Sequence, residues 1–469
     1  MSEKLRKAFA STLAKKAFQI NEISVLTFQD IQSLLSLIPH LQEVADSYTE
    51  ALKDNELIFP FAALGKLYNS QGLYSLSEIW HSQYLQQSRI RFGEHSHYTM
   101  LGANNLGNVY FLQGRYLESK SLLLQAEEGC RQLGHDREPY YLTILNNLAN
   151  IYQAEDNHDR AKDLFLQVLE IRKSILEDDN PDIAISLNNL GNFYSHINRY
   201  SNAKPLLEEA LTRFKQVFGY EHSHVAMVLD NLGIMYNGLA KYSEAESFFS
   251  QALRLRERLH GENHLDVALS YNNLGNLHET RRSYVKAEKL LLRSLEISKS
   301  ILGDRHLDLV ATLNNLGRFY KSQKYYTKAE NLYLHSLEIV KEFLGDGHLR
   351  STIIMNNLAE AYIEQEKYKE GELLHLKALE IKCRVFGNHH PSVAITLNNL
   401  GGLYVVQTKC TQAEVKYKQS LRIFQMCYGE DHPSTNTVKE NLRDLESITI
   451  DKINKITSKK SSKKKSNIR

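Results

Sequence analysis

The chain has 469 residues, a formal net charge of +2, and 42% hydrophobic residues. It contains only seven prolines, four cysteines and one tryptophan. The longest apolar runs fall well short of the roughly 20 residues that span a bilayer, and the cysteines form no CxxC pair. We therefore expect a helical, cytoplasmic protein with reduced thiols, without disulfides or a structural zinc site.

Residues 1–54 are predicted to form an N-terminal helical capping segment. Within residues 2–18, Leu5, Phe9 and Leu13 share one helical face, with lysines and an arginine opposite. Such a helix could bind an anionic membrane or act as a transit peptide. Because Glu3 interrupts the basic pattern and no small-residue cleavage site follows, we favour a helix that caps the rest of the fold.

A leucine preceded by Asn or Ala returns every 42 residues through the remainder of the chain. We call these residues the anchor leucines, and we number other positions relative to them. The anchors are Leu64, Leu106, Leu148, Leu190, Leu232, Leu274, Leu316, Leu358, Leu400 and Leu442. A fixed period without insertions indicates an array of one supersecondary unit.

The unit 391–432 shows what each repeat is expected to form. Pro391 suits the first turn of a helix, and Leu397 and Leu400 continue at helical spacing. A polar stretch ends this first helix, and a second helix runs to Gly429, which is expected to close it in the left-handed conformation. Small residues recur at positions +1 and +13, where they would let the two helices approach closely. Each repeat is therefore predicted to be a helical hairpin.

The pattern of a small residue at +1, tyrosine at +4 and small residues at +13 and +20 resembles the tetratricopeptide repeat. The 42-residue length and the segment ILGDRHLDLVATLNNLGRFY (301–320) resemble the kinesin-light-chain type, most closely its prokaryotic arrays. This resemblance implies an all-α fold, a right-handed α-solenoid of helix-turn-helix repeats. Nine full repeats would occupy residues 55–432, and residues 433–450 would form a C-terminal capping helix.

The last segment, 451–469, is rich in lysine and carries a charge of +7, which leaves −5 for residues 1–450. Such a composition cannot bury enough apolar surface to order itself, so a disordered tail is predicted. The tail could contact nucleic acid or an anionic membrane weakly, or it could serve only to solubilise the chain.

The asparagines of the first helix suggest a binding function. At about 100° per residue, positions −2 and +2 lie on the face opposite the anchor, and the resemblance implies that this face lines a concave groove. Amides there could pair with the backbone of an extended peptide, because each offers a donor and an acceptor. Charged exceptions in the late repeats would give selectivity. The predicted groove residues are Asn104, Asn108, Asn146, Asn150, Asn188, Asn192, Asn272, Asn276, Asn314, Arg318, Lys321, Asn356, Glu360 and Asn398.

Other recurring residues favour structural roles. Asparagines at −1 lie to the side, where adjacent repeats would meet, and are expected to hydrogen-bond there. Histidines also return every 42 residues, from His222 to His432. Equivalent residues of successive repeats lie too far apart to share one ion, so we predict no metal site. No nucleotide-binding, zinc-protease or hydrolase motif appears, so no catalysis and no cofactor are expected.

Three functional hypotheses remain. The first is a non-enzymatic scaffold or adaptor that binds extended segments of partner proteins. Kinesin light chains bind motor cargo in this way, but this chain lacks the long heptad coiled coil that would engage a heavy chain. The second is the ligand-sensing module of a prokaryotic signal-transduction system whose ATPase is on another chain, and the third is RNA binding through the basic tail with Arg318 and Lys321.

Overall fold

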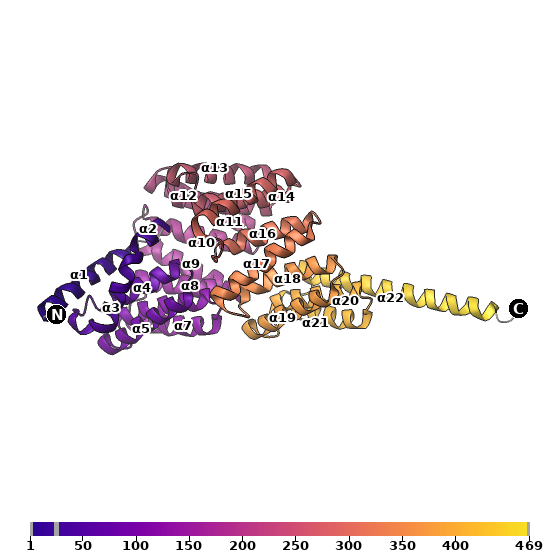
Figure 1. Cartoon of the computed structure of the whole chain (residues 1–469), viewed down its shortest axis with the longest axis horizontal. Helices are drawn as coiled ribbons and strands as arrows, with labels where there is room; N and C mark the ends of the chain where they lie inside the picture. Colours follow the sequence, from indigo (N-terminus) through magenta and orange to yellow (C-terminus); the bar gives the residue numbers. More distant parts are fainter. Residues whose placement is uncertain (1–2, 23–27, 467–469) are drawn as a thin grey trace. The chain divides into compact units, whose positions relative to one another are not determined.

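The computed structural model describes residues 3–22 and 28–466, and in this part of the chain it contains helices and no strand (Figure 1). Contacts divide the chain into two compact units. The first comprises Met1–Thr312 with Glu342–Gly345, and the second comprises Leu313–Lys341 with Asp346–Arg469.

Short helices precede the repeats. They are α1 (Glu3–Glu22), α2 (Phe28–Leu34), η1 (Leu35–Leu37), α3 (Ile38–Ser47) and η2 (Thr49–Ala51). Helix α1 packs against α4, and its buried face carries Ala10, Leu13, Ala14 and Ala17, whereas Leu5 is exposed. The apolar face predicted for this helix is therefore rotated, since small alanines allow closer packing than Leu5 would. Residues 23–27 lie outside the described residues.

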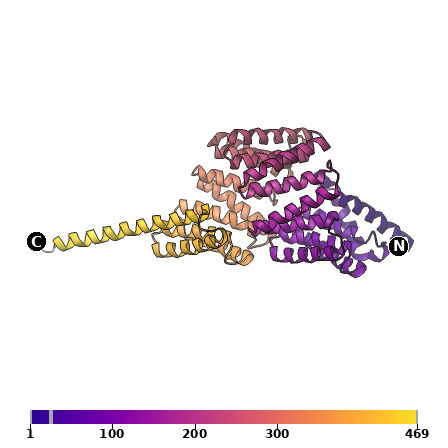
Figure 2. The same cartoon turned by 180° about the vertical axis from the view of Figure 1, so that it is seen from behind.

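Helical hairpins follow in tandem through the first unit. They are α4 (Phe59–Ser70) with α5 (Tyr74–Phe92), α6 (His97–Leu112) with α7 (Tyr116–Gln132), α8 (Pro139–Ala154) with α9 (His158–Ile175), α10 (Pro181–His196) with α11 (Tyr200–Phe218), α12 (Ser223–Gly238) with α13 (Tyr242–His260), and α14 (Leu265–Thr280) with α15 (Tyr284–Leu302). Figure 2 shows the same antiparallel pairs from behind. Each first helix begins before an anchor leucine, as the repeat predicted.

The pattern continues through the second unit. Helices α16 (Leu309–Ser322) and α17 (Tyr326–Leu344) contain the unit boundary, and α18 (Leu349–Glu364) with α19 (Tyr368–Phe386) and α20 (Pro391–Val406) with α21 (Cys410–Tyr428) complete the array. The predicted all-α fold of tandem helix-turn-helix repeats is confirmed.

Within a hairpin, the residue at +17 on the second helix packs onto the small residue at +1 on the first. A Cβ built on Gly191 would lie 2.8 Å from the Leu207 side chain, and one on Gly233 would lie 2.6 Å from the Phe249 ring. The residue at +13 is also pressed against this site, because a Cβ on Gly371 would lie 3.1 Å from the Ala359 carbonyl oxygen. The small residues therefore set the close approach of the two helices.

The turn geometry differs from the sequence prediction. Gly429 has φ 86° and ψ 179°, so it lies in an extended region with positive φ that only glycine adopts readily, and not in the left-handed helical region. A positive φ of 55–65° occurs instead at +8, between the two helices of a hairpin. The non-glycine residues there are Asp156, Asn198, Ala240, Arg282, Lys324, Glu366 and Thr408.

The last helix, α22 (Pro433–Ser466), extends past residue 450, where the capping helix was expected to end. Its first turns pack on the final hairpin, where Val438 and Leu445 are buried beside Val393 and Tyr417. The backbone thus shows no break between the expected cap and the lysine-rich segment, and disorder of residues 451–469 stays a prediction.

Candidate binding face

At −2, Asn104, Asn188, Asn272 and Asn356 are buried and Asn146, Asn314 and Asn398 are half-buried, whereas side chains open to a groove were expected. Asn104 and Asn188 are each only 4% exposed. Each accepts a hydrogen bond from the −1 asparagine of the next repeat, from Asn147 Nδ2 at 2.9 Å and from Asn231 Nδ2 at 2.8 Å. The first helices of successive repeats lie close enough to cover these side chains, so their amides already have protein partners.

The same bond joins later repeats. Asn357 donates to Asn314 at 2.9 Å, and Asn441 donates to Asn398 at 2.8 Å. The prediction that the −1 asparagines hydrogen-bond between repeats is confirmed at these four junctions. Asn146 differs, since its buried Oδ1 has no hydrogen-bond partner among the described residues.

Two other −2 residues are buried by different partners. Asn356 Oδ1 lies 2.9 Å from the His375 Nδ1 atom of its own repeat. Asp230 replaces asparagine and pairs with Arg256, whose Nη1 is 2.5 Å from the Asp230 carboxylate and 2.6 Å from Ser270 Oγ. Asn272 is also buried. We conclude that position −2 serves cohesion between helices and repeats.

Position +2 is the accessible part of the predicted set. Asn150, Asn192 and Arg318 are exposed, and Asn108, Asn276 and Glu360 are half-buried. Gly402 and Ile234 carry no amide at this position. Accessible amides at +2 therefore occur in four repeats, at Asn108, Asn150, Asn192 and Asn276.

The sequence analysis missed an apolar row at −5, which lies within about 20° of +2 around the helix. Leu269, Ile353 and Ile395 are 48%, 62% and 49% exposed, and Leu101, Ile185 and Met227 are half-buried. The helical period alone could have found this row, because the residues recur every 42 positions. Within each unit, the −5 and +2 residues form what we call the binding face. Three repeats of the first unit combine an apolar residue at −5 with an amide at +2, namely Leu101 with Asn108, Ile185 with Asn192 and Leu269 with Asn276.

The binding face is hollowed in the first three repeats. A pocket of about 560 Å³ is lined there by Phe59, Leu101 and Thr143 at −5 and by Lys66 and Asn108 at +2. Helix α1 supplies another wall through Phe18 and Asn21. The hollow can hold a ligand of the size that protein pockets commonly bind.

The late charged residues are already paired in the second unit. Lys321 forms an ion pair with Glu360 of the next repeat, and Tyr326 Oη donates to Glu364 at 3.3 Å. These residues line a smaller pocket of about 400 Å³. Lys321 and Glu360 thus balance each other's charge across one repeat, and a role for Lys321 in partner selectivity stays a prediction.

The recurring histidines cap the first helices. In His264, His348 and His390, Nδ1 accepts the backbone N–H of the residue two positions later, at 3.1–3.2 Å. A phenylalanine or tyrosine four residues earlier often stacks on this ring, as Phe386 does on His390 at 4.1 Å. The histidines thus fix the start of each repeat.

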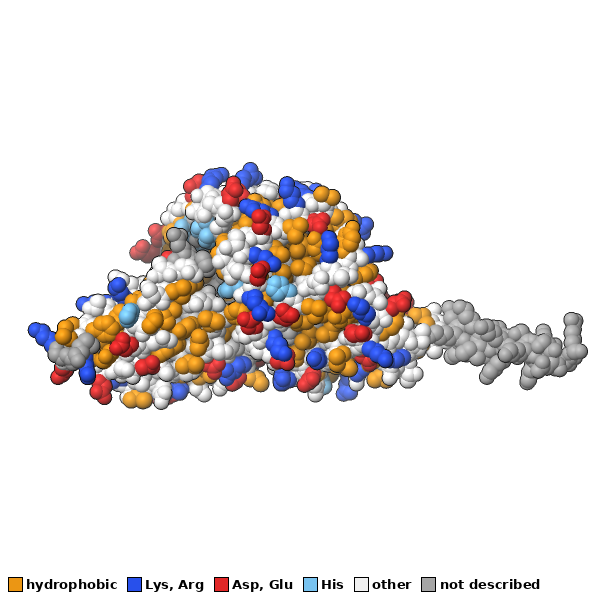
Figure 3. Space-filling view, in the orientation of Figure 1, with side chains coloured by type: hydrophobic (Ala, Val, Ile, Leu, Met, Phe, Trp, Pro, Cys, Tyr) orange, Lys and Arg blue, Asp and Glu red, His pale blue; other side chains and the backbone are white. Residues whose placement is uncertain are grey.

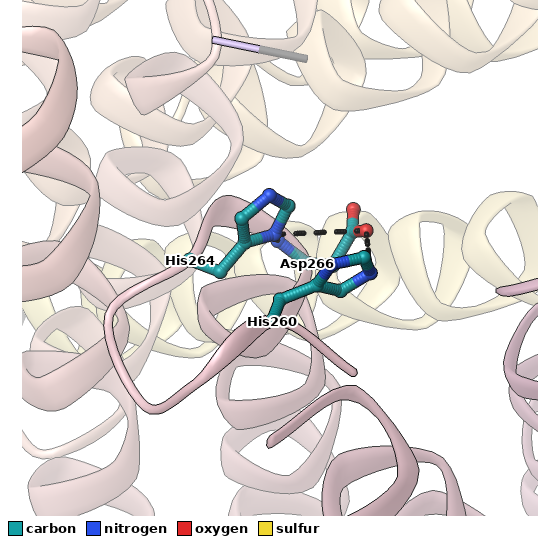
Figure 4. A group of neighbouring side chains, drawn as sticks. All are labelled: His260, His264 and Asp266. Carbon is teal, nitrogen blue, oxygen red and sulfur yellow. Dashed lines mark hydrogen bonds and ion pairs between the residues drawn. The ribbon is translucent and has the colours of Figure 1, made fainter. Parts of the chain in front are cut away.

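One histidine pair lies beside a carboxylate. His260 Nε2 and His264 Nδ1 are 3.6 and 3.7 Å from the Asp266 carboxylate (Figure 4). The two rings stack at 4.2 Å with an angle of 20°, so the planes do not converge on a point about 2 Å from both nitrogens, as a shared metal ion requires. The Nδ1 atom of His264 also accepts a hydrogen bond from the backbone N–H of Asp266, so its lone pair is not available to a metal ion. The arrangement therefore fits a helix cap better than a metal centre.

The sequence matches a family model that describes the tetratricopeptide repeat. The matched segments overlap and cover residues 97–174, 140–216, 182–258, 224–300, 266–342, 308–384 and 350–426. The chain therefore belongs to the tetratricopeptide-repeat family, whose members are generally non-enzymatic scaffolds.

Among solved structures, the chain is similar to BtubC (BKLC) from P. vanneervenii, with 26% identity and a TM-score of 0.40 over 49% of this chain and 92% of that one. A putative kinesin light chain from P. anserina shares 19% identity at a TM-score of 0.39, over 44% of this chain and 99% of that one. The tetratricopeptide repeat that the sequence predicted is confirmed by the family model.

A third structure is similar over a longer span. The Rap protein complexed with competence and sporulation factor shares 14% identity at a TM-score of 0.51, over 81% of this chain and 99% of that one. At this identity the likeness shows the fold alone. No curated protein matches the chain. Among the described residues, no helix is long and apolar enough to cross a membrane.

Proposed function

We propose that this chain is a non-enzymatic scaffold that binds extended segments of partner proteins along the binding face. The observation that carries the proposal is the pairing of an accessible apolar residue at −5 with an accessible amide at +2 in three repeats, Leu101 with Asn108, Ile185 with Asn192 and Leu269 with Asn276. The amides can hydrogen-bond a peptide backbone, and the apolar residues can pack against its side chains. Each of these repeats adds one such pair, so affinity would accumulate along them.

The charge distribution favours a protein over a nucleic acid as the partner. Basic and acidic side chains alternate over the face shown in Figure 3, and ion pairs such as Lys120 with Glu155 and Arg115 with Glu78 join successive repeats. Nucleic-acid binding usually needs a continuous basic surface. The sensor hypothesis stays a prediction, since no contact within the described residues favours it over a scaffold.

The proposal is tested with peptides selected from a random library on the intact chain, whose affinities are then measured by fluorescence anisotropy. The variant Asn150→Ala/Asn192→Ala removes two exposed amides from adjacent repeats. Each lost hydrogen bond costs about 0.5–1.5 kcal/mol, so the double variant should weaken binding about tenfold.

A matched control is Asn202→Ala, which removes an exposed amide from the second helix of a hairpin. Its peptide affinity should equal that of the unmodified chain, and circular dichroism should be unchanged in both variants. If the double variant binds as tightly as the control, the amide row plays no part in recognition.

A further inference from the structure

The first repeat departs from the others where the pocket lies. Position −2 is Ala62, and position +17 is His81. Position +20, which is small or β-branched in the later repeats, is Tyr84. Those later residues are Ala126, Val168, Ala210, Ala252, Ser294, Ser336, Ala378 and Ser420. Since Ala62 has no amide, Asn105 cannot make the bond that joins the −1 and −2 asparagines elsewhere, and space opens beside it.

One wall of this pocket is aromatic and apolar, whereas asparagines such as Asn69 and Asn105 line much of the rest. Phe18 of α1 and Phe59 of α4 contact each other with ring centroids 5.0 Å apart, and Leu101 of α6 also lines the pocket. Phe18 is 43% exposed, so its ring is available to a ligand. Such a wall suits a flat ring, which can stack on or lie edge-on to it.

The interior holds polar atoms that lack partners. Tyr84 and His81 are 0% and 5% exposed, and both line the pocket. Neither Tyr84 Oη nor His81 Nδ1 has a hydrogen-bond partner among the described residues. The equivalent histidine, His375, does have one, because its Nδ1 lies 2.9 Å from the Asn356 amide at −2. Leaving such groups unpaired destabilises the empty pocket, so a ligand that pairs them is favoured.

The interior is polar but uncharged. Burial lowers the pKa of His81 to about 4, so its ring is neutral near pH 7. Lys66, a cation that lines the pocket, donates to the backbone carbonyl of Asn21 at 2.9 Å. A charged group beside His81 and Tyr84 would lose its hydration; a cation would meet no carboxylate in the lining, and an anion would meet only this already hydrogen-bonded ammonium group. The pocket therefore favours a neutral ligand.

We propose that this pocket binds a phenol ring, supplied by a tyrosine side chain of the bound segment. A phenol hydroxyl can donate to a ring nitrogen of His81 and accept from the hydroxyl of Tyr84 at once, whereas an indole N–H can only donate. The ring would pack against Phe18, Phe59 and Leu101. The protein source of the phenol rests on the proposed function, whereas the chemistry of the pocket does not.

The test uses the intact chain with p-cresol and toluene, which differ only in the hydroxyl, and N-acetyltyrosinamide as the amino-acid form. Saturation-transfer NMR and calorimetry should show p-cresol binding in the millimolar range, about fivefold or more tighter than toluene. N-acetyltyrosinamide should compete with p-cresol.

Two variants distinguish p-cresol binding in this pocket from nonspecific hydrophobic binding elsewhere on the chain. Ala62→Asn restores the residue that most later repeats carry at −2, so it should fold, fill the space and pair His81; p-cresol affinity should fall about tenfold. Tyr84→Phe removes one of the two proposed hydrogen bonds, so it should reduce the preference for p-cresol over toluene without changing toluene binding. Asn202→Ala, remote in sequence and outside the pocket lining, should bind p-cresol normally.

The inference is overturned if p-cresol fails to bind at about 5 mM, if toluene binds equally well, or if both pocket variants bind p-cresol unchanged. If selected peptides bind but p-cresol does not displace them, the inference that the pocket holds a tyrosine side chain of the bound segment is wrong, and the proposed function stands. If p-cresol binds in this variant-sensitive way but no peptide binds the face, the phenol pocket stands and the proposed function falls.

Discussion

At the residue scale, the asparagines show how two neighbouring positions can have opposite roles. Asn188 is buried and accepts from Asn231, whereas Asn192, one turn later, is exposed. A helical wheel places both on one face, because they differ by only about 40°. Their roles separate because the first helix of the next repeat covers one side of that face.

We predict that Asn188→Ala destabilises the chain by about 1–3 kcal/mol, because the half-buried Asn231 amide would lose its acceptor. Asn192→Ala should change the free energy of unfolding by no more than about 0.5 kcal/mol. Urea denaturation of the two variants provides the comparison. Equal stabilities would mean that the bond between repeats contributes nothing measurable.

The sequence predicted that the −1 asparagines hydrogen-bond between repeats, but it did not predict the burial of the −2 side chains. The side chain at −1 points along the array toward the adjacent repeat. It therefore contacts that repeat over a range of distances between repeats. The burial of Asn104 or Asn188 depends on how closely successive first helices approach. Helical periodicity gives direction around one helix, and it does not give the distance to the next.

Lys382 is a second residue whose role only packing could show. It is 7% exposed, and its Nζ donates to Thr396 Oγ1 at 2.9 Å and to the Ser392 carbonyl at 3.2 Å. Among the residues that the structure describes, no carboxylate forms an ion pair with it. Burial lowers the pKa of Lys382 to about 8 from an ordinary value of 10.5.

We predict that stability rises with pH at this site. Between about pH 8 and 10.5 the unfolded chain binds the Lys382 proton and the folded chain does not, so raising the pH favours folding. Relative to Lys382→Met, the unmodified chain should gain about 3 kcal/mol of unfolding free energy across this interval. Urea denaturation of both proteins at several pH values measures the difference. Parallel curves would show that Lys382 has an ordinary pKa.

At the element scale, the hairpin depends on the contact between +1 and +17. The sequence predicted a small residue at +1, and the structure adds its partner, which varies among leucine, phenylalanine, tyrosine and histidine. Helix α20 offers a direct comparison because Gly401 and Gly402 are adjacent. A Cβ on Gly401 would lie 2.5 Å from the Tyr417 ring, whereas one on Gly402 would meet only the Tyr417 hydroxyl at 3.7 Å.

We predict opposite effects of the same substitution at these two glycines. Gly401→Ala should destabilise the chain by about 1–3 kcal/mol through overpacking against Tyr417. Gly402→Ala should stabilise it by up to about 1 kcal/mol, because alanine favours the helix. Thermal unfolding followed by circular dichroism distinguishes them. Similar shifts for both would show that the Tyr417 ring moves aside at little cost.

At the scale of the whole molecule, a repeat array needs its ends covered, since each hairpin buries its core against the next one. Within the first unit, α1 covers α4 at one end. Within the second, the first turns of α22 cover the hairpin of α20 and α21. The 42-residue period predicted the number and order of the hairpins, but the end helices lie outside the repeat, which is why their faces and lengths were harder to predict.

The end of the array is tested by two truncations. A chain ending at Ile450 keeps Val438 and Leu445, which are 1% and 3% exposed in the core of the last hairpin. It should unfold at the temperature of the full chain, if the lysine-rich segment adds no packing. A chain ending at His432 uncovers Val393 and Tyr417, so its unfolding temperature should fall by several degrees and its tendency to aggregate should rise. Differential scanning calorimetry with light scattering measures both.

Two outcomes would contradict this interpretation. If the chain ending at His432 is as stable as the chain ending at Ile450, the contacts of Val438 and Leu445 do not cap the array. If loss of residues 451–469 alone destabilises the chain, that segment packs on the fold, and the interpretation of it as a solubilising tail is wrong.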